Sequence, residues 1–167
     1  VQAAIAQIPA ERQAAATILY TAHSLPTAMA DTCDYVVQLE EACRLVSEGL
    51  QRSDQRLIYQ SRSGPPQQPW LEPDVCDVLG ELAGEKSRED VVIVPVGFIS
   101  DHVEVVYDLD IEARAVCEQG GLNMVRAGTV GTHPRFVRMI RELIDERFSE
   151  NPVRAALGNL GPPPDIC

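Results

Sequence analysis

Strand-like and helix-like stretches alternate along this chain, and that alternation restricts it to few folds. Four short runs rich in apolar and β-branched residues each precede a segment with helical spacing of its apolar residues. The strands are predicted at residues 17–22, 56–60, 90–98 and 123–127. The helices are predicted at residues 1–16, with a break near Pro9, and at 34–50, 74–83, 102–119 and 134–148. This order predicts an α/β fold, a Rossmann-like parallel sheet flanked by helices.

Polar residues follow each predicted strand, where the loops of a parallel sheet leave its carboxyl edge. Open α/β folds bind ligands at that edge, so these residues are expected to lie together in space. They are His23-Ser24, Gln60-Ser61-Arg62, Asp101-His102 and Thr129. Ser100-Asp101 is also the expected N-cap of the helix that begins at 102, and Gly120-Gly121 is expected to end it.

Composition excludes several classes of protein. With 167 residues, 45% of them hydrophobic and 23% charged, the chain suits one folded α/β domain. A net charge of −11 argues against binding to nucleic acid or to anionic membranes. The apolar runs are too short to span a bilayer. The chain has no GxGxxG, P-loop or GxSxG motif, which argues against the usual types of dinucleotide-binding protein, NTPase and hydrolase.

Cysteine usage indicates a reducing compartment. The five cysteines, at 33, 43, 76, 117 and 167, are odd in number, and no pair has CxxC spacing. Residues 1–16 do not have the pattern of a signal peptide, so we expect a cytoplasmic protein with mostly reduced thiols. The first four cysteines are expected to be small packing residues, whereas Cys167 follows a Pro-rich turn. Because the chain starts at Val1, we expect it to be processed or part of a longer protein.

Histidines and carboxylates are the candidates for chemistry. His23 follows a strand directly; alone it would most simply be a half-buried side chain bonded to the backbone, but His102 is expected at the same edge. Glu104, Asp108 and Glu112 recur every four residues on one helix face, with no Lys or Arg from 100 to 113. This row is either a solvated acidic face or a path for protons or a divalent cation such as Fe²⁺ or Mg²⁺.

The loop from 60 to 70 permits two interpretations. It contains Arg62 and Trp70, the only Trp, with Gly64 and three prolines between them. It is either an ordinary rigid loop or a binding loop, in which Arg62 would hold a ligand carboxylate and Trp70 would form an apolar wall for a flat ligand.

Five strings of residues, in order, resemble ferrochelatase. They are TAHSLP at 21–26, QSRSGP at 60–65, WLEP at 70–73, PVGFISDHVE at 95–104 and YDLDIE at 107–112. The resemblance covers about residues 15–148. It implies insertion of Fe²⁺ into a porphyrin during haem synthesis, by a chelatase-like fold of two similar domains with the porphyrin between them. Residues 1–148 would be the C-terminal domain and 149–167 a tail, and the N-terminal domain would be a missing partner.

The resemblance also implies roles for individual residues. His23 would be the proton acceptor or a metal ligand, with Glu104 as its partner; these two roles compete and both stay open. Asp108 and Glu112 would relay protons or iron along a π-distorted helix, so the metal set is His23, Glu104, Asp108 and Glu112. The substrate-binding residues would be Ser61, Arg62, Trp70 and His102.

Finer features of the resemblance concern substrate and cofactor. SRSGPP and WLEPDV are similar to actinobacterial members, whose substrate is usually coproporphyrin III, with protoporphyrin IX as the alternative. Cys167 resembles the first cysteine of the tail that supplies a [2Fe–2S] cluster in some members. A cluster needs four thiolates, which this chain does not supply in the right set, so it is a hypothesis about the full-length protein.

Two other functions remain as alternatives. One is a chelatase of the same fold that inserts Co²⁺ into a corrin precursor. The other is a non-catalytic module that binds a tetrapyrrole or a metal, and an isolated chain with half a cleft would behave similarly. We expect a monomer with no membrane span and no nucleic-acid partner.

Overall fold

The computed structural model describes residues 1–65, 67–85, 89–150 and 152–162, and its centre is a four-stranded parallel sheet. The strands are β1 (Thr17–His23), β2 (Arg56–Gln60), β3 (Asp90–Val94) and β4 (Asn123–Arg126). They lie in the order β2-β1-β3-β4. This confirms the predicted α/β fold with a parallel sheet. The register pairs His23 with Gln60, which brings the ends of β1 and β2 side by side.

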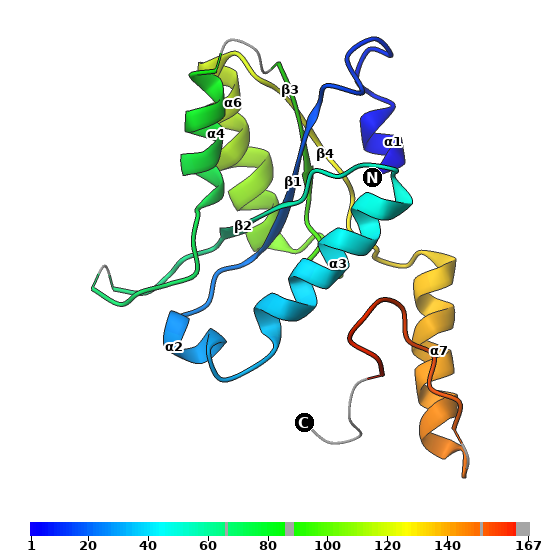
Figure 1. Ribbon diagram of the computed structural model, residues 1–167. Coiled ribbons are helices and arrows are strands. Elements are labelled where there is room, and N and C mark those ends of the chain that lie inside the picture. The colour runs from blue at the N-terminus through cyan, green and yellow to red at the C-terminus, as the bar shows by residue number, and fades with distance from the viewer. Residues whose placement is uncertain (66, 86–88, 151, 163–167) are drawn as a thin grey trace.

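Helices cover both faces of the sheet (Figure 1). One face carries α4 (Val75–Ala83), α5 (Val103–Val105), the π-helix η1 (Val106–Ala113) and α6 (Arg114–Gly120). The other face carries α1 (Gln2–Ile5) and α3 (Tyr35–Gly49). All five residues of β3 are buried, as its continuous apolar sequence predicts for a strand between two helical layers.

β3 is shorter than predicted because Pro95 follows Val94. Proline has no N–H for the ladder, and the Val96 N–H instead donates to the Val94 carbonyl at 2.8 Å. Gly97 then donates to the Thr21 carbonyl at 3.1 Å. A Cβ at Gly97 would lie 2.7 Å from the Ala22 Cβ, so only glycine permits this approach of the loop to β1.

The first 16 residues contradict the predicted helix. Only α1 is helical there, and turns follow it up to β1. Pro9 cannot donate to a helical hydrogen bond and disfavours helical backbone in the residue before it. Tertiary contacts then hold the segment: Ile8 is buried, and Arg12 pairs with Glu89 at 2.7 Å and with Asp90 at 3.2 Å.

The predicted N-cap at Ser100-Asp101 is wrong. His102 caps α5, because its Nδ1 accepts the Val105 N–H at 3.4 Å. Asp101 instead pairs with Arg126 at 2.8 Å. The end of this helical run is as predicted, since Gly121 takes the left-handed conformation, with φ of +73°, directly after α6.

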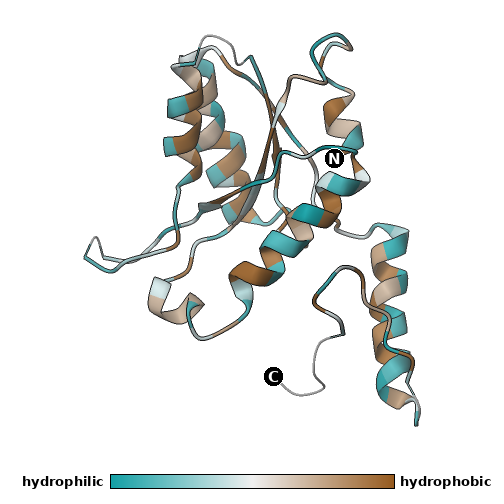
Figure 2. Ribbon diagram, viewed as in Figure 1, coloured by the Kyte–Doolittle hydropathy of each residue, from teal (hydrophilic) through white to brown (hydrophobic). Residues whose placement is uncertain are grey.

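Two helices, one after β1 and one after β4, complete the fold. The short α2 (Thr27–Ala30) was not predicted, whereas α7 (Pro134–Phe148) has the predicted bounds. α7 extends away from the sheet and contains no buried residue, although apolar and polar residues alternate along it (Figures 1 and 2). No helix in the described part of the chain is long and apolar enough to cross a membrane.

The cysteines only partly follow the packing prediction. Cys43 and Cys117 are buried on opposite faces of the sheet, and Cys76 is half-buried. Cys33 is exposed, so the packing prediction is wrong there; it lies just after α2 rather than in a helix face. These four cysteines are free, and Cys167 lies outside the described residues.

Candidate active site at the carboxyl edge of the sheet

His23 and Glu104 form the first part of the site. The His23 Nε2 atom lies 3.5 Å from the Glu104 Oε1 atom, and their side chains are 33% and 45% exposed. The other ring nitrogen, Nδ1, lies 2.5 Å from the Ser24 carbonyl oxygen. Because a carbonyl oxygen only accepts, Nδ1 carries the proton of this contact, and Nε2 is the ring nitrogen that faces Glu104.

Hydrogen bonds fix the backbone around His23. Tyr35 donates its hydroxyl to the His23 carbonyl at 2.9 Å, and burial raises the pKa of Tyr35, which keeps it a donor. Ser24 donates its N–H to the Gln60 carbonyl at 2.8 Å and its hydroxyl to the Leu71 carbonyl at 2.8 Å. The imidazole therefore stands at the end of β1, where the following residue ties the chain to β2 and to the segment after Trp70.

The acidic row lies on α5 and η1, and η1 is the π-helix that the resemblance implies. Glu104 is in the first turn after the His102 cap. Val105, Leu109 and Ala113 are fully buried against the sheet and α4, so they orient the helix. Each carboxylate of the row comes one residue before one of these buried side chains. π-helices are rare and often occur at functional sites.

Asp108 is held by the end of β2. The Gln60 amide donates to Asp108 Oδ2 at 3.2 Å, and the Ser61 hydroxyl donates to the same oxygen. Asp108, Glu112 and Arg62 are among the residues that line a hollow of about 140 Å³, which is room for several water molecules. Ser61 was predicted to bind substrate; the structure places its hydroxyl on the acidic row.

Asp74 and Cys76 also line this hollow, and the sequence did not single them out. Asp74 caps α4 by accepting the Cys76 N–H at 2.8 Å. Burial raises the pKa of Asp74, and the charges of Asp77 and Asp108 add to that effect. Burial and the nearby carboxylates, Asp74 first, raise the pKa of Cys76 to about 11, so this thiol is a poor metal ligand at neutral pH. An acidic residue directly before a helix was the available signal for Asp74.

Trp70 and Arg62 belong to a loop that lies next to the His23 segment. Trp70 is half-buried and forms a β-bridge with Pro26. A Cβ at Gly64 would lie 2.4 Å from the Trp70 ring, so the ring packs directly on this glycine. Arg62 pairs with Glu72 at 3.7 Å. The roles of Trp70 and Arg62 toward a ligand remain predictions.

His102 has a structural role in this arrangement. It caps α5, and its ring meets Phe98 edge-on with 5.4 Å between the ring centroids. Among the described residues, no hydrogen bond or ion pair joins His102 to His23 directly, and His102 lies two residues before Glu104, which contacts His23. Its role toward a substrate remains a prediction. Arg126, at the end of β4, contacts both Asp101 and Asp110 and was not predicted.

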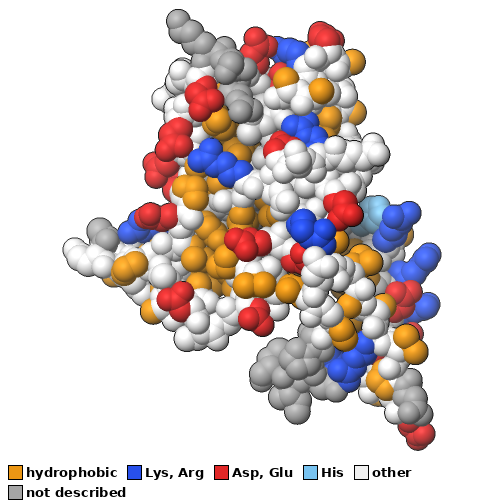
Figure 3. All heavy atoms as spheres, in the orientation of Figure 1, with side chains coloured by type: hydrophobic (Ala, Val, Ile, Leu, Met, Phe, Trp, Pro, Cys, Tyr) orange, Lys and Arg blue, Asp and Glu red, His pale blue; other side chains and the backbone are white. Residues whose placement is uncertain are grey.

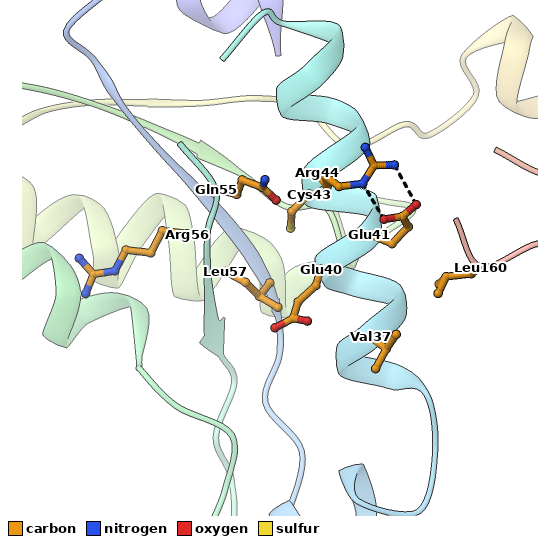
Figure 4. A pocket seen from close by; sticks show the side chains of 9 residues that line it. All are labelled: Val37, Glu40, Glu41, Cys43, Arg44, Gln55, Arg56, Leu57 and Leu160. Atoms are coloured by element: carbon orange, nitrogen blue, oxygen red, sulfur yellow. Dashed lines mark hydrogen bonds and ion pairs between the residues drawn. The ribbon is translucent and has the colours of Figure 1, made fainter. Parts of the chain in front are cut away.

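Within residues 1–65, 67–85, 89–150 and 152–162, no three His, Cys, Asp or Glu side chains form a metal-binding group. The acidic row is a series of separate carboxylates rather than a closed cage. A hollow of about 580 Å³ lies elsewhere, between α3 and β2 (Figure 4). Three of its charged side chains have partners: Arg44 bonds to Glu41, and Arg56 points away and reaches Glu81.

Known proteins similar to this chain match it over the region that contains the site. The family model "Ferrochelatase" matches residues 1–148. The chain belongs to the ferrochelatase family. A ferrochelatase of Rhodopirellula baltica is 53% identical over 150 residues, with 90% of this chain and 43% of that protein covered. A coproporphyrin III ferrochelatase of Frankia alni is 46% identical, with 99% of this chain and 45% of that protein covered.

A third relative, a coproporphyrin III ferrochelatase of Streptomyces griseus, is 41% identical, with 100% of this chain and 49% of that protein covered. The chain thus spans about half the length of the curated relatives it matches. Among solved structures, a putative cobalamin biosynthesis CbiX protein from Marinobacter aquaeolei has a TM-score of 0.54 at 17% identity. It covers 81% of this chain and 98% of its own, and it supports the chelatase-like fold alone.

The described cysteines do not fit a [2Fe–2S] cluster. Such a cluster needs four thiolates around one centre. Cys43 and Cys117 are buried on opposite faces of the sheet, Cys33 is exposed, and burial raises the pKa of Cys43 to about 12. No step of the chemistry at this site involves a cluster.

Proposed function

We propose that this chain is the metal-site half of a ferrochelatase that inserts Fe²⁺ into a porphyrin. The observation that carries the proposal is the His23–Glu104 pair at 3.5 Å, which Asp108 and Glu112 extend along one helix. The family membership is consistent with this arrangement. A single histidine beside a row of carboxylates suits a reaction that moves two protons and a divalent cation at the same place.

The chemistry requires a base at the porphyrin face. The porphyrin loses its two pyrrole protons as Fe²⁺ enters the ring plane. A base at the face of the ring from which those protons leave must accept them. With Nδ1 donating to the Ser24 carbonyl, Nε2 of His23 is the atom that can accept a proton. Glu104 would then form an ion pair with the imidazolium. Because a protonated Nε2 cannot bind a metal, we assign His23 as the proton acceptor and the carboxylates to the cation.

The second half of the protein is part of this proposal. Residues 1–148 would be one domain and 149–167 a tail, and a preceding domain would close the porphyrin cleft. α7 supports this division, because Val137, Ile140, Ile144 and Phe148 form one apolar stripe and are 52%, 42%, 52% and 86% exposed. Hydrophobic side chains are visible on the surface of this helix between charged ones (Figure 3). Curated relatives have about twice this length, so we propose that the preceding domain covers the stripe.

The His23 assignment is tested in the full-length protein. We expect His23→Ala to lower metal insertion by at least about 100-fold, the low end for loss of an acid–base group, with porphyrin affinity within a few-fold of the wild type. Insertion is followed by porphyrin absorbance and binding by fluorescence quenching. His133→Ala is the matched control, since His133 only caps α7. Turnover near the wild-type rate in His23→Ala would refute the assignment.

We propose coproporphyrin III as the substrate. The names of the relatives from Frankia and Streptomyces support it, whereas the name of the Rhodopirellula relative specifies no porphyrin. The four propionates of coproporphyrin III would give Arg62 a carboxylate to bind. We expect kcat/KM for coproporphyrin III to exceed that for protoporphyrin IX, and Arg62→Ala to reduce the difference. Equal values for the two porphyrins would refute this substrate.

Two further assays test the alternatives and the cluster. Fe²⁺ and Co²⁺ offered with porphyrin and with a corrin precursor distinguish an iron from a cobalt chelatase, and tight porphyrin binding without insertion would favour a non-catalytic module. In the full-length protein, loss of [2Fe–2S] absorption and paramagnetic signals in Cys167→Ser would support the cluster hypothesis. Unchanged spectra would remove it.

A further inference from the structure

Two residues at the end of β2 hold the carboxylate of Asp108 in one orientation. Gln60 is the last residue of β2 and is only 1% exposed, and its Nε2 donates to Asp108 Oδ2 at 3.2 Å. The Ser61 hydroxyl donates to the same oxygen. Both donors therefore act on Oδ2, and neither holds Oδ1.

The backbone at Ser61 is in an unfavourable conformation that aims its side chain. Ser61 has φ of +63°, in the left-handed region that residues other than glycine seldom occupy. Ser24 bonds to the carbonyl of Gln60 at 2.8 Å, so the end of β2 stays in register with β1 while the chain turns at Ser61. Strain of this kind persists where the surroundings over-determine the conformation, often at functional sites.

Burial of the Gln60 amide costs free energy, and its hydrogen bond to Asp108 is the contact that offsets this cost. Its Oε1 atom is buried and has no hydrogen-bond partner within the described part of the chain. Rotating the amide would satisfy nothing, because the oxygen would then face the Asp108 carboxylate. A leucine or methionine of similar size would avoid the buried unsatisfied acceptor. Among the described residues, the hydrogen bond to Asp108 is thus the favourable polar contact of this side chain.

We infer that Gln60 and Ser61 are positioning residues for Asp108, an inference that rests on the proposed function. By holding Oδ2, they fix the orientation of the Asp108 carboxylate in the hollow that it shares with Glu112. They act on the step that involves the metal ion, not on porphyrin affinity. Partners of this kind, which hold a group that binds a metal, affect metal affinity or activity by about 10- to 100-fold.

The test uses steady-state metal insertion by the full-length protein, with the metal ion and the porphyrin varied separately. Ser61→Ala and Gln60→Met each remove one donor, and we expect kcat/KM for the metal to fall about tenfold in each, with porphyrin Kd within twofold. Ser61→Asn should recover most of the loss, since asparagine tolerates the left-handed region and its amide can donate. Ser63→Ala, exposed in the same loop, is the matched control and should equal the wild type.

A double-mutant cycle separates positioning from a general structural role. In an Asp108→Asn background, Ser61→Ala should have no further effect if Ser61 acts through Asp108. Equal losses in both backgrounds, or single variants within twofold of the wild type, would overturn this inference and leave the proposed function standing. A wild-type protein that binds porphyrin but inserts no metal would overturn the proposed function, and this inference with it.

Discussion

Removal of the Arg126 guanidinium should loosen the helix that carries the acidic row. Arg126 contacts Asp110 of η1 through two hydrogen bonds, Nε to Oδ1 at 2.8 Å and Nη2 to Oδ2 at 2.9 Å. A third bond, Nη1 to Asp101 Oδ1 at 2.8 Å, ties in the loop before α5. The hydrogen bond to Asp110, then that to Asp101, and the charges of both carboxylates raise the pKa of Arg126 above its usual value. This arginine therefore joins the end of β4 to both ends of the segment that presents Glu104.

The exposed fractions of the paired side chains set the free-energy cost of removing Arg126. Arg126 is 15% exposed and Asp110 26%, so their bidentate pair lies between exposed pairs, worth about 0.2–1 kcal/mol, and buried pairs, which cost about 3–5 kcal/mol to break. We expect Arg126→Ala to cost about 2 kcal/mol, nearly all of it from Asp110. Asp101 is 42% exposed and contributes little. At 1.36 kcal/mol per factor of ten, this is about a 30-fold increase in local opening.

Native-state hydrogen exchange in the full-length protein measures this opening directly for amides of η1 and α6. Arg126→Lys keeps the charge and should lose only part of the protection, because lysine cannot form the bidentate contact. Arg114→Ala is the matched control: Arg114 approaches the same Asp110 only to 3.7 Å and is 41% exposed, so exchange should change less than about threefold. Equal acceleration in Arg114→Ala and Arg126→Ala, or none in Arg126→Ala, would refute this reasoning.

Three further outcomes are expected. Leu109→Ala, at a fully buried position of η1, should lower the free energy of unfolding by about 2–5 kcal/mol, measured by urea denaturation. Gly64→Ala should displace the Trp70 ring and change its fluorescence, because the added Cβ would lie 2.4 Å from that ring. Hydrogen bonds from Arg44 lower the pKa of Glu41 to about 2. Ionised Glu41 thus stabilises the fold fully above pH about 4.5, and this contribution is lost as pH falls toward 2; Glu41→Gln should remove that part of the pH dependence.

Local pattern was sufficient for some elements and not for others. β2 and α7 have the predicted bounds because breakers flank them and their apolar periodicity is unambiguous. The first 16 residues are rich in alanine and glutamine and favour a helix by propensity, but Pro9 and the ion pairs of Arg12 fix turns instead. A helix cap depends on loop geometry, which is why His102 rather than Asp101 occupies that position.

In the candidate site too, some features could be predicted from the sequence and others could not. Sheet topology alone places His23 and Ser61 at one edge, since β1 and β2 are parallel neighbours. The contact between Ser61 and Asp108 depends on the rotation of η1 about its axis and on the left-handed backbone at Ser61, neither of which has a local sequence signature. Asp74 enters the site only because α4 begins beside that helix.

The burial pattern along this helical run gives a reason for the π-helix that does not depend on resemblance. The buried side chains of α5, η1 and α6 are Val105, Leu109, Ala113 and Cys117, at a strict spacing of four residues. On an α-helix, each step of four residues advances by about 40° beyond a full turn, so this stripe would rotate by about 120° between Val105 and Cys117 and leave the core. Wider turns, closed by i→i+5 hydrogen bonds, offset that drift.

The same widening accounts for the acidic row. Glu104, Asp108 and Glu112 precede successive members of the buried stripe by one residue, so whatever keeps the stripe facing the sheet also keeps the carboxylates aligned. An α-helix with this sequence would either expose part of its core or turn Glu112 away from the hollow that it shares with Asp108. Burial of the apolar stripe thus supplies the free energy that holds three like charges in one row, against a mutual repulsion of only a few tenths of a kcal/mol per pair. Packing of the core is therefore sufficient to align the three carboxylates.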